Sequence, residues 1–244
     1  MNPVKNLQQI IETALGLVYP VNCSISGRPL DSSNGLWVDE KELTGVVRVT
    51  SPVCLRCGKP YQGAMSNPRQ CANCAKLDLH FDSARAYAKT EGVVRELIHK
   101  FKYGEQLWLR NLLCKWMGEA YLYHYADYAF DGIVPVPIHP RKWRERGFNQ
   151  AEILARALAL EVKINYLSCL FRDKDTSTQT TFNRRKRFTN LKQTFKLSPK
   201  AKVRGLKLLL VDDVLTTGAT ASECAQLLKQ GGATDVHVLT IARG

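Results

Sequence analysis

The sequence lacks the features of a membrane or secreted protein. None of its uncharged apolar runs reaches the roughly 18–20 residues that a helix needs to cross a bilayer, which argues against membrane insertion. The N-terminal stretch 7–20 carries Gln8, Gln9 and Glu12, so it is too polar for the apolar core of a secretory signal. We therefore expect a cytoplasmic protein whose cysteines are mostly reduced.

Acidic residues are scarce relative to basic ones. The chain has 22 Asp and Glu against 35 Lys and Arg, a net charge of +13. Between Arg141 and Arg204 there are 17 basic residues and 5 acidic ones, a surplus of 12, so the rest of the chain is nearly neutral. Such a basic block favours a polyanionic partner, either nucleic acid, an acidic membrane surface or a phosphorylated substrate. A solvated loop rich in Lys and Arg is the alternative.

The sequence shows no internal repeat, and its C-terminal half instead alternates strand and helix patterns. The apolar run Lys207–Asp212 predicts a central parallel strand that is covered on both faces. A Thr/Gly turn, a helix over Thr220–Gln230 and a last strand over Asp235–Ala242 follow it. This order is a βαβ unit, so the sequence predicts an α/β fold with a mainly parallel sheet.

Weaker patterns precede this unit, and the residues between them read as a long loop. The other expected elements are strands over 82–90, Gly132–Ile138 and 164–171, and helices over Val93–Phe101, Gln106–Tyr123 and Gln150–Leu160, the last capped by Asn149. Residues 172–204 are polar and basic with few apolar anchors. A loop of this length in a compact domain is usually functional or disordered.

The strongest candidate site follows the apolar strand, at the position where open α/β sheets bind ligands. Small residues in the turn let backbone N–H groups cradle a phosphate, and the start of the next helix adds partial positive charge. The two carboxylates before the turn can accept hydrogen bonds from sugar hydroxyls and favour Mg²⁺ or a cationic sugar carbon. A ribose 5′-phosphate would satisfy both halves, whereas an N-cap turn with two surface acids is the alternative. The residues concerned are Asp212, Asp213, Thr216, Thr217, Gly218, Ala219 and Thr220.

Four of the eight cysteines form two pairs, Cys54-x-x-Cys57 and Cys71-x-x-Cys74, with 13 residues between them. This spacing is typical of a zinc ribbon, in which two knuckles present four thiolates to a tetrahedral Zn²⁺. Because the protein fills all four positions, such a zinc is structural rather than catalytic. Two disulfides are the alternative, which a reducing compartment disfavours. The isolated cysteines, which fit small buried apolar positions, are Cys114, Cys169 and Cys224.

Two motifs carry a resemblance to known proteins. The segment 209–220 resembles the motif with which type I phosphoribosyltransferases bind phosphoribosyl pyrophosphate (PRPP), and residues 134–142 with 146–150 are similar to the signature of the ComF/GntX group. The resemblance covers roughly residues 50–244. It implies a type I phosphoribosyltransferase-like core that binds PRPP with Mg²⁺, where Asp212 and Asp213 contact the ribose hydroxyls and the turn holds the 5′-phosphate. It also implies an association with DNA uptake in natural transformation.

The resemblance also divides the chain into three segments. Residues 1–50 would hold an N-terminal helix and a degenerate ribbon segment, 51–80 a zinc ribbon, and 81–244 the phosphoribosyltransferase-like domain. The group often carries a further pair of cysteine knuckles near its N-terminus, but only Cys23 remains here, so a second zinc is not expected. Arg141 and Lys142, at a strand end, could neutralise a leaving pyrophosphate; a basic approach to a helix without a ligand is the alternative.

The basic segment could track a phosphodiester backbone, with interleaved phenylalanines as stacking surfaces for bases. The candidate nucleic-acid contacts are Arg172, Lys174, Arg184, Arg185, Lys186, Arg187 and Lys192, and the phenylalanines are Phe182, Phe188 and Phe195. A lid that closes on the PRPP phosphates is the alternative for the charges, and packing under the loop is the alternative for the rings. No base-reading motif is present, so little sequence preference is expected.

Three functions remain open from the sequence. The first is a PRPP-binding protein that also binds single-stranded DNA and acts in DNA uptake, together with proteins of the uptake machinery. The second is an active phosphoribosyltransferase that transfers ribose 5-phosphate to a small-molecule acceptor, without a nucleic-acid role. The third is a binding module whose PRPP pocket is vestigial, against which the intact acidic pair argues. Turnover and the acceptor do not follow from the sequence.

Overall fold

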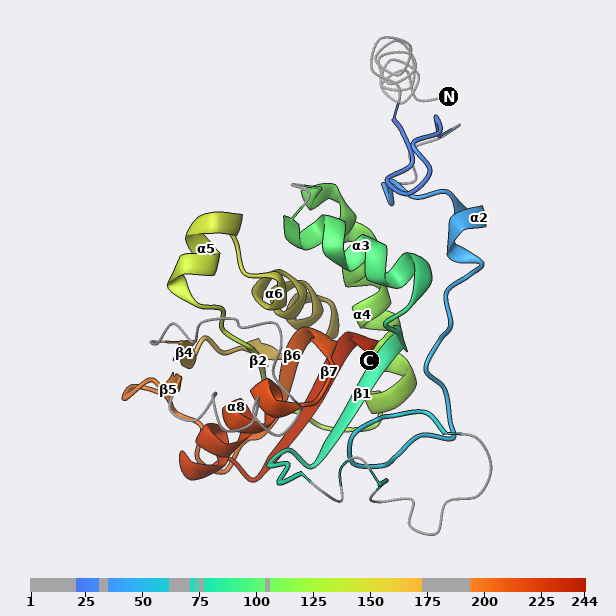
Figure 1. Ribbon diagram of the computed structural model, residues 1–244. Helices are drawn as coiled ribbons and strands as arrows, with labels where there is room; N and C mark the ends of the chain where they lie inside the picture. Colours follow the sequence, from blue (N-terminus) through green and yellow to red (C-terminus); the bar gives the residue numbers. More distant parts are fainter. Residues whose placement is uncertain are drawn as a thin grey trace, which may run out of the picture.

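A parallel sheet with helices on both faces forms the centre of the molecule, which we describe from a computed structural model (Figure 1). The described residues are 21–30, 35–61, 71, 72, 74, 77–103, 106–172 and 194–244. Among them, no helix has both the length and the apolar character that crossing a membrane requires.

The sheet has five parallel strands in the order β1–β7–β6–β2–β3. Its strands are β1 (Ser83–Lys89), β2 (Gly132–Pro135), β3 (Asn165–Tyr166), β6 (Lys207–Leu215) and β7 (Asp235–Arg243). The central strand β6 has the near-continuous apolar run expected of a strand that is covered on both faces. Because all five strands run in one direction, their carboxyl ends meet at one edge, and the predicted α/β fold is confirmed.

The two faces of the sheet carry two separate hydrophobic cores. One core joins Leu209 and Val211 to the helices α3 (Gly92–Tyr103), α4 (Arg110–Tyr125) and α6 (Gln150–Val162). The other joins Leu208 and Leu210 to α8 on the opposite face. Helix α8 spans Ala219–Gln230. The alternation of successive β6 side chains between the faces therefore decides which helix each residue meets.

The expected boundaries need several corrections. The single strand expected over 164–171 is wrong, because β3 belongs to the main sheet while β4 (Leu170–Arg172) pairs with β5 (Phe195–Leu197) in a separate antiparallel pair. The expected loop 172–204 therefore begins in β4 and contains the strand β5. Two short helices were also not expected: α2 (Glu40–Leu43) and α5 (Pro140–Arg146). The single helix expected over Gln106–Tyr123 is instead the 3₁₀ turn η1 (Leu107–Leu109) followed by α4.

The cysteine-rich segment packs directly against the main sheet. Cys54, Cys57 and Cys74 share the α8-side core with Phe81 and Ala84, at or near the start of β1. Gly58 explains the close approach: its φ is +66°, and a Cβ there would lie 2.3 Å from the carbonyl oxygen of Ala84. The boundary that separates 51–80 from 81–244 stays a prediction.

Candidate functional site

The predicted phosphate turn lies between the end of β6 and the start of α8, at the carboxyl edge of the sheet. Gly218 is the N-cap of α8 and has a left-handed backbone (φ +82°), a conformation that favours glycine. The ring of Phe81 and a methyl group of Leu79 pack behind it, since a Cβ on Gly218 would meet them at 3.4–3.5 Å. The hydroxyl of Thr217 accepts a hydrogen bond from the N–H of Ala219 (3.3 Å), which closes the turn. The segment thus has the strand–turn–helix geometry expected from its sequence.

The two acids belong to the last part of β6, which runs three residues beyond the expected end at Asp212. The Oδ1 of Asp212 accepts a hydrogen bond from the N–H of Asp213 (2.9 Å), so the carboxylate of Asp212 lies against its neighbour. Asp213 is buried and forms an ion pair with Lys102, which comes from α3. Sequence reasoning missed Lys102, because nothing in the pattern of α3 indicates that its last turn reaches the end of β6.

At this end of β6, the positive charge of the protein only partly balances the two carboxylates, which favours binding of a further cation. Burial raises the pKa of Asp212 well above its usual range, and the neighbouring carboxylate of Asp213 raises it further. The ammonium of Lys102 acts in the opposite direction. Two close carboxylates with one lysine form a site that a Mg²⁺ complex or a cationic sugar carbon would stabilise.

The segment after β2 lies next to this site, because the N–H of Val136 donates to the carbonyl of Val211 (2.9 Å). His139 caps α5 by accepting a hydrogen bond from the N–H of Arg141 (3.1 Å). The guanidinium of Arg141 is largely exposed and pairs with Glu145 (3.0 Å). Its role in pyrophosphate binding stays a prediction.

Lys142 lies in a concentration of positive charge. Burial lowers the pKa of Lys142, and the charges of Arg146, Arg172 and Lys102 lower it further. These residues come from α5, β4 and α3, so three separate elements bring cations towards one place. An anion such as pyrophosphate would relieve their mutual repulsion. Lys102 and Arg146 were not among the residues expected here.

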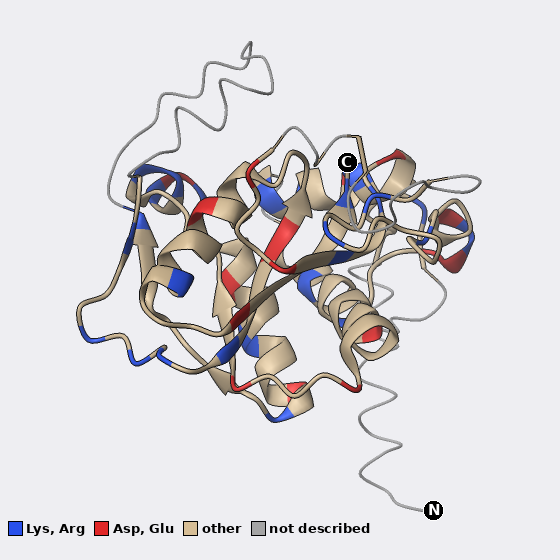
Figure 2. Cartoon of the chain, turned by 90° about the horizontal axis from the view of Figure 1, so that it is seen from below, with Lys and Arg blue, Asp and Glu red and all other residues tan. Residues whose placement is uncertain are grey.

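Most of the predicted nucleic-acid contacts lie outside the described residues. They are Lys174, Arg184, Arg185, Lys186, Arg187 and Lys192. Arg172 is described, and its guanidinium lies over the ring of Phe195 at 5.1 Å. Phe195 itself is 2% exposed, so this ring packs in the core and is not a stacking surface. Figure 2 shows blue along most of α5 at the left-hand edge, where Arg141, Lys142, Arg144 and Arg146 lie.

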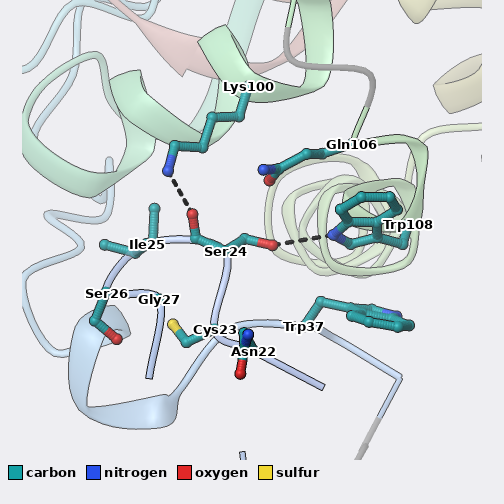
Figure 3. Close-up of a pocket in the computed structure, with 10 residues that line it drawn as sticks. All are labelled: Asn22, Cys23, Ser24, Ile25, Ser26, Gly27, Trp37, Lys100, Gln106 and Trp108. Atoms are coloured by element: carbon teal, nitrogen blue, oxygen red, sulfur yellow. Dashed lines mark hydrogen bonds between the residues drawn. The ribbon is translucent and has the colours of Figure 1, made fainter. Parts of the chain in front are cut away.

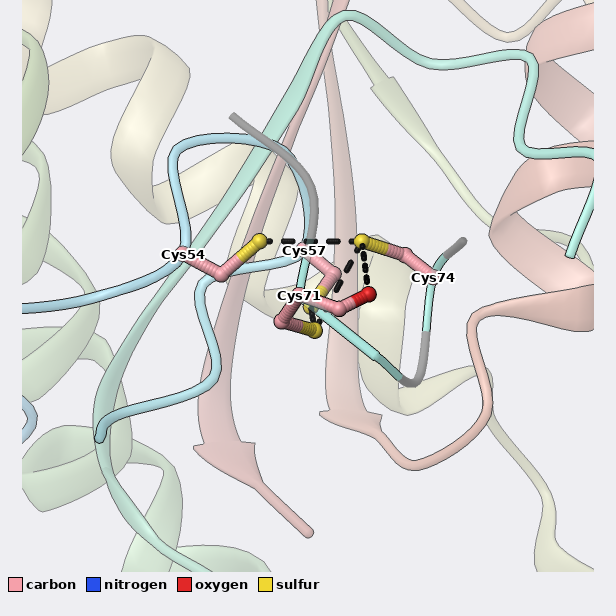
Figure 4. A group of neighbouring side chains, drawn as sticks. All are labelled: Cys54, Cys57, Cys71 and Cys74. Carbon is pink, nitrogen blue, oxygen red and sulfur yellow. Dashed lines mark hydrogen bonds between the residues drawn. The ribbon is translucent and has the colours of Figure 1, made fainter. Parts of the chain in front are cut away.

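The four paired cysteines converge, as Figure 4 shows. Their sulfur atoms all lie within 4.8 Å of one another, and three of the pairs are separated by 3.6 Å. A tetrahedral zinc with Zn–S bonds of about 2.3 Å places its sulfurs about 3.8 Å apart. All eight cysteines are free, so the disulfide alternative is wrong. The cluster could therefore hold a metal such as zinc, with the four cysteines Cys54, Cys57, Cys71 and Cys74 as ligands.

Arg243 connects the cysteine cluster with the phosphate turn. It is the last residue of β7 and only 5% exposed. Its Nε donates to the carbonyl of Cys57 (2.9 Å), and its Nη1 donates to the carbonyls of Leu215 (3.0 Å) and Thr216 (2.6 Å). One buried guanidinium thus spans a cysteine knuckle and the first residues of the turn. The sequence alone gave no sign of this contact.

The expectation of no internal repeat is wrong at the scale of one knuckle. Residues 22–29 and 53–60 fold alike: each has a bridge between its ends (Asn22 with Pro29, Val53 with Pro60) and a glycine with positive φ. Each also has the same two backbone hydrogen bonds. These are Cys23 N–H to Arg28 and Gly27 N–H to Cys23, and Cys54 N–H to Lys59 and Gly58 N–H to Cys54. Ser26 stands where the second knuckle has Cys57.

In this first knuckle, other contacts fix Ser24 and its neighbours against the helices (Figure 3). The N–H of Asp39 donates to the sulfur of Cys23 (3.3 Å), and the indole of Trp108 donates to the hydroxyl of Ser24 (3.0 Å). Lys100 donates to the carbonyl of Ser24. The rings of Trp37 and Trp108 lie 5.4 Å apart. Hydrogen bonds and aromatic packing therefore hold this knuckle, and the degenerate ribbon expected from the sequence stays a prediction.

Comparison with known proteins finds similar families, relatives and structures. Residues 144–244 match the phosphoribosyl transferase domain family. The chain is 32% identical to competence protein F of Haemophilus influenzae over 199 residues, which cover 79% of this chain and 85% of that protein. It is 30% identical to the DNA utilization protein YhgH of Salmonella typhi over 236 residues, which cover 93% and 99%. An adenine phosphoribosyltransferase structure from Leishmania tarentolae aligns at 16% identity with a TM-score of 0.37, covering 58% of this chain and 60% of that one.

Proposed function

This chain belongs to the ComF/GntX family, and on that basis we propose that it binds PRPP and single-stranded DNA and acts in DNA uptake during natural transformation. The names of its relatives, competence protein and DNA utilization protein, support a role in DNA uptake. The observation that carries the PRPP part is the strand–turn–helix unit at the carboxyl edge of the sheet, with two carboxylates immediately before the turn.

The roles within the PRPP site divide by chemistry. Asp212 and Asp213 accept hydrogen bonds from the ribose hydroxyls, and residues Thr216–Thr220 surround the 5′-phosphate with backbone N–H groups and hydroxyls. Mg²⁺ accompanies the pyrophosphate. Arg141 and Lys142 would face the pyrophosphate, and the cations around Lys142 support this assignment.

The cysteine cluster would hold a structural Zn²⁺, because four thiolates at tetrahedral spacing leave no open position for a substrate. This zinc would hold the two cysteine knuckles together and would have no catalytic role. The basic residues of the segment between β4 and β5 would contact the DNA backbone, and proteins of the uptake machinery would be partners. The cytoplasmic location expected from the sequence stays a prediction.

Titration calorimetry of Mg-PRPP tests the central proposal. The wild type should bind, and both Asp212→Ala and Asp213→Ala should weaken binding at least roughly tenfold, the effect of about 1.4 kcal/mol. Asp127→Asn, an exposed acid at the end of α4, is the control and should bind like the wild type. Absence of heat with the wild type would contradict the proposal.

Release of pyrophosphate separates binding from catalysis. Incubation with Mg-PRPP, with and without single-stranded DNA, shows whether the protein is a transferase and whether DNA affects it. Release without any DNA, combined with no DNA binding near physiological salt, would favour the other candidate, a phosphoribosyltransferase for a small-molecule acceptor. The surplus of 12 positive charges between Arg141 and Arg204 favours the proposal with DNA, because a small acceptor leaves most of that charge without a partner.

A further inference from the structure

A groove of about 520 Å³ lies beside the proposed PRPP site, between the end of β2, helix α5 and the strands β3 and β4. Two of its lining residues are exposed aromatics: Trp143 on α5 is 52% exposed, and Phe171 on β4 is 42% exposed. Neither ring belongs to the two hydrophobic cores. Core packing therefore does not explain why these two positions hold aromatic residues.

The charges of the groove suit a polyanion. Arg144 and Arg172 line it, and within the described part of the chain Arg144 has no ion pair. Glu152 is the acidic lining residue, and Arg156 neutralises it through an ion pair of 2.9 Å. The groove is therefore positive overall, and it begins the basic block that extends from Arg141 to Arg204.

The groove opens onto the edge of the sheet that carries the phosphate turn. Pro135, which lines the groove, pairs in register with Val211, the residue before Asp212. A chain that occupies the groove can therefore continue towards the acidic pair. Duplex DNA would not use the two rings, because its bases are already stacked on one another, whereas unpaired bases can stack on any aromatic face.

We propose that this groove binds single-stranded DNA, with unpaired bases stacked on Trp143 and Phe171 and phosphates held by Arg144 and Arg172. The inference rests on the proposed function, to which it adds the position and the chemistry of the DNA contact. It also assigns the contact to residues of α5 and β4 in addition to the basic segment that follows β4.

Fluorescence anisotropy with a labelled oligothymidylate of about 15 nucleotides, near the upper site size of such proteins, tests the groove. Trp143→Ala and Phe171→Ala should each weaken binding by about 5- to 150-fold, since one base stack is worth about 1–3 kcal/mol. Trp143→Phe should retain most of the affinity. The matched control is Tyr123→Ala, which removes a ring that is 57% exposed on α4, away from the groove.

The outcomes distinguish the groove from the general function. If the wild type binds the oligonucleotide and the Trp143 and Phe171 variants bind it equally well, the groove is not the DNA-binding site, while the proposed function stands. If the wild type does not bind near physiological salt, both are wrong. Equal affinity for a duplex of the same length would contradict stacking. Calorimetry with Mg-PRPP shows that each variant is folded, and if Trp143→Ala fails to fold, Arg144→Gln tests the same groove, with a weaker affinity expected.

Discussion

The negative charge of Asp212 suits the proposed ligand but is unfavourable in the free protein. Its carboxylate is half-buried beside that of Asp213, and within the described part of the chain Lys102 is the cation that offsets the two negative charges. A bound Mg²⁺ complex or cationic sugar would supply the missing positive charge. Without a ligand, the charged form of Asp212 is unfavourable, which is why its pKa is raised.

Asp212→Asn should therefore stabilise the unliganded protein while it removes Mg-PRPP binding. A group whose folded pKa is raised contributes stability below its unfolded pKa, and that stability is lost as the pH rises through the folded pKa. The variant has no such loss, so its advantage in Tm should be larger at pH 8 than at pH 5. Each kcal/mol gained raises Tm by roughly 2–4 °C in a chain of this size.

Thermal unfolding of the wild type and Asp212→Asn at several pH values checks this expectation. Asp127→Asn should leave Tm unchanged across the same range, because that acid is exposed. A variant that is less stable than the wild type at pH 8 would show that Asp212 is not a strained carboxylate in the free protein.

At the scale of elements, the two knuckles offer a matched comparison. Gly58 and Gly27 hold equivalent positions and have similar φ values of +66° and +70°, so an alanine is strained at either position. They differ in surroundings: a Cβ at Gly58 would meet the backbone of β1 at 2.3 Å, while nothing lies within 4 Å of a Cβ at Gly27.

Gly58→Ala should consequently destabilise the protein far more than Gly27→Ala. The backbone strain of about 1–2 kcal/mol is common to both, and the additional cost at Gly58 is the displacement of the knuckle from β1. Tm measures the total loss of stability, and metal content measures whether displacement of the knuckle disturbs the cysteine cluster. Equal losses of Tm in the two variants would contradict direct packing of this knuckle on the sheet.

The elements that could be predicted from the sequence are those whose residues repeat on a simple period or whose turn is chemically distinctive. The apolar run of β6, the amphipathic pattern of α3 and the Asn149 cap of α6 are all in the structure at or near their expected places. The cysteine spacing likewise predicts the cluster. These features depend on local sequence, so they can be read without knowing the fold.

What could not be predicted depends on contacts between distant segments. Lys102 meets Asp213 across 111 positions, and Arg243 meets Cys57 across 186. No local pattern indicates either contact. The split of 164–171 into β3 and β4 has a similar cause, because pairing with β2 and with β5 decides where each strand ends. The likeness of the two knuckles was hidden because Ser26 replaces a cysteine.

At the scale of the whole molecule, the uneven charge predicts a strong dependence of DNA binding on salt. For a single strand, the logarithm of the binding constant falls with the logarithm of salt concentration with a slope of about −0.7 for each phosphate neutralised. Arg144→Gln and Arg172→Gln should each make the slope shallower by about 0.7. Lys163→Gln, at the end of α6, is a control that should leave the slope unchanged.

Anisotropy titrations over a series of salt concentrations measure these slopes. A slope that does not change in either arginine variant would place the phosphate contacts elsewhere on the basic block. The aromatic variants should show the opposite behaviour, a lower affinity with an unchanged slope, because stacking releases no counterions.

We expect Arg243 to couple the cysteine cluster and the phosphate turn thermodynamically. Its guanidinium binds the carbonyl of Cys57 in the knuckle and the carbonyls of Leu215 and Thr216 in the turn. A change in the knuckle that moves this guanidinium therefore also affects the turn. If a metal bound by the cysteines strengthens Mg-PRPP binding by some factor, Mg-PRPP must strengthen metal binding by the same factor. Mg-PRPP should therefore slow the transfer of zinc to a colorimetric chelator relative to Mg²⁺ alone, and Arg243→Met should abolish that protection. Equal rates with and without PRPP in the wild type would mean that the two sites are independent; a difference would make zinc retention a readout of ligand occupancy.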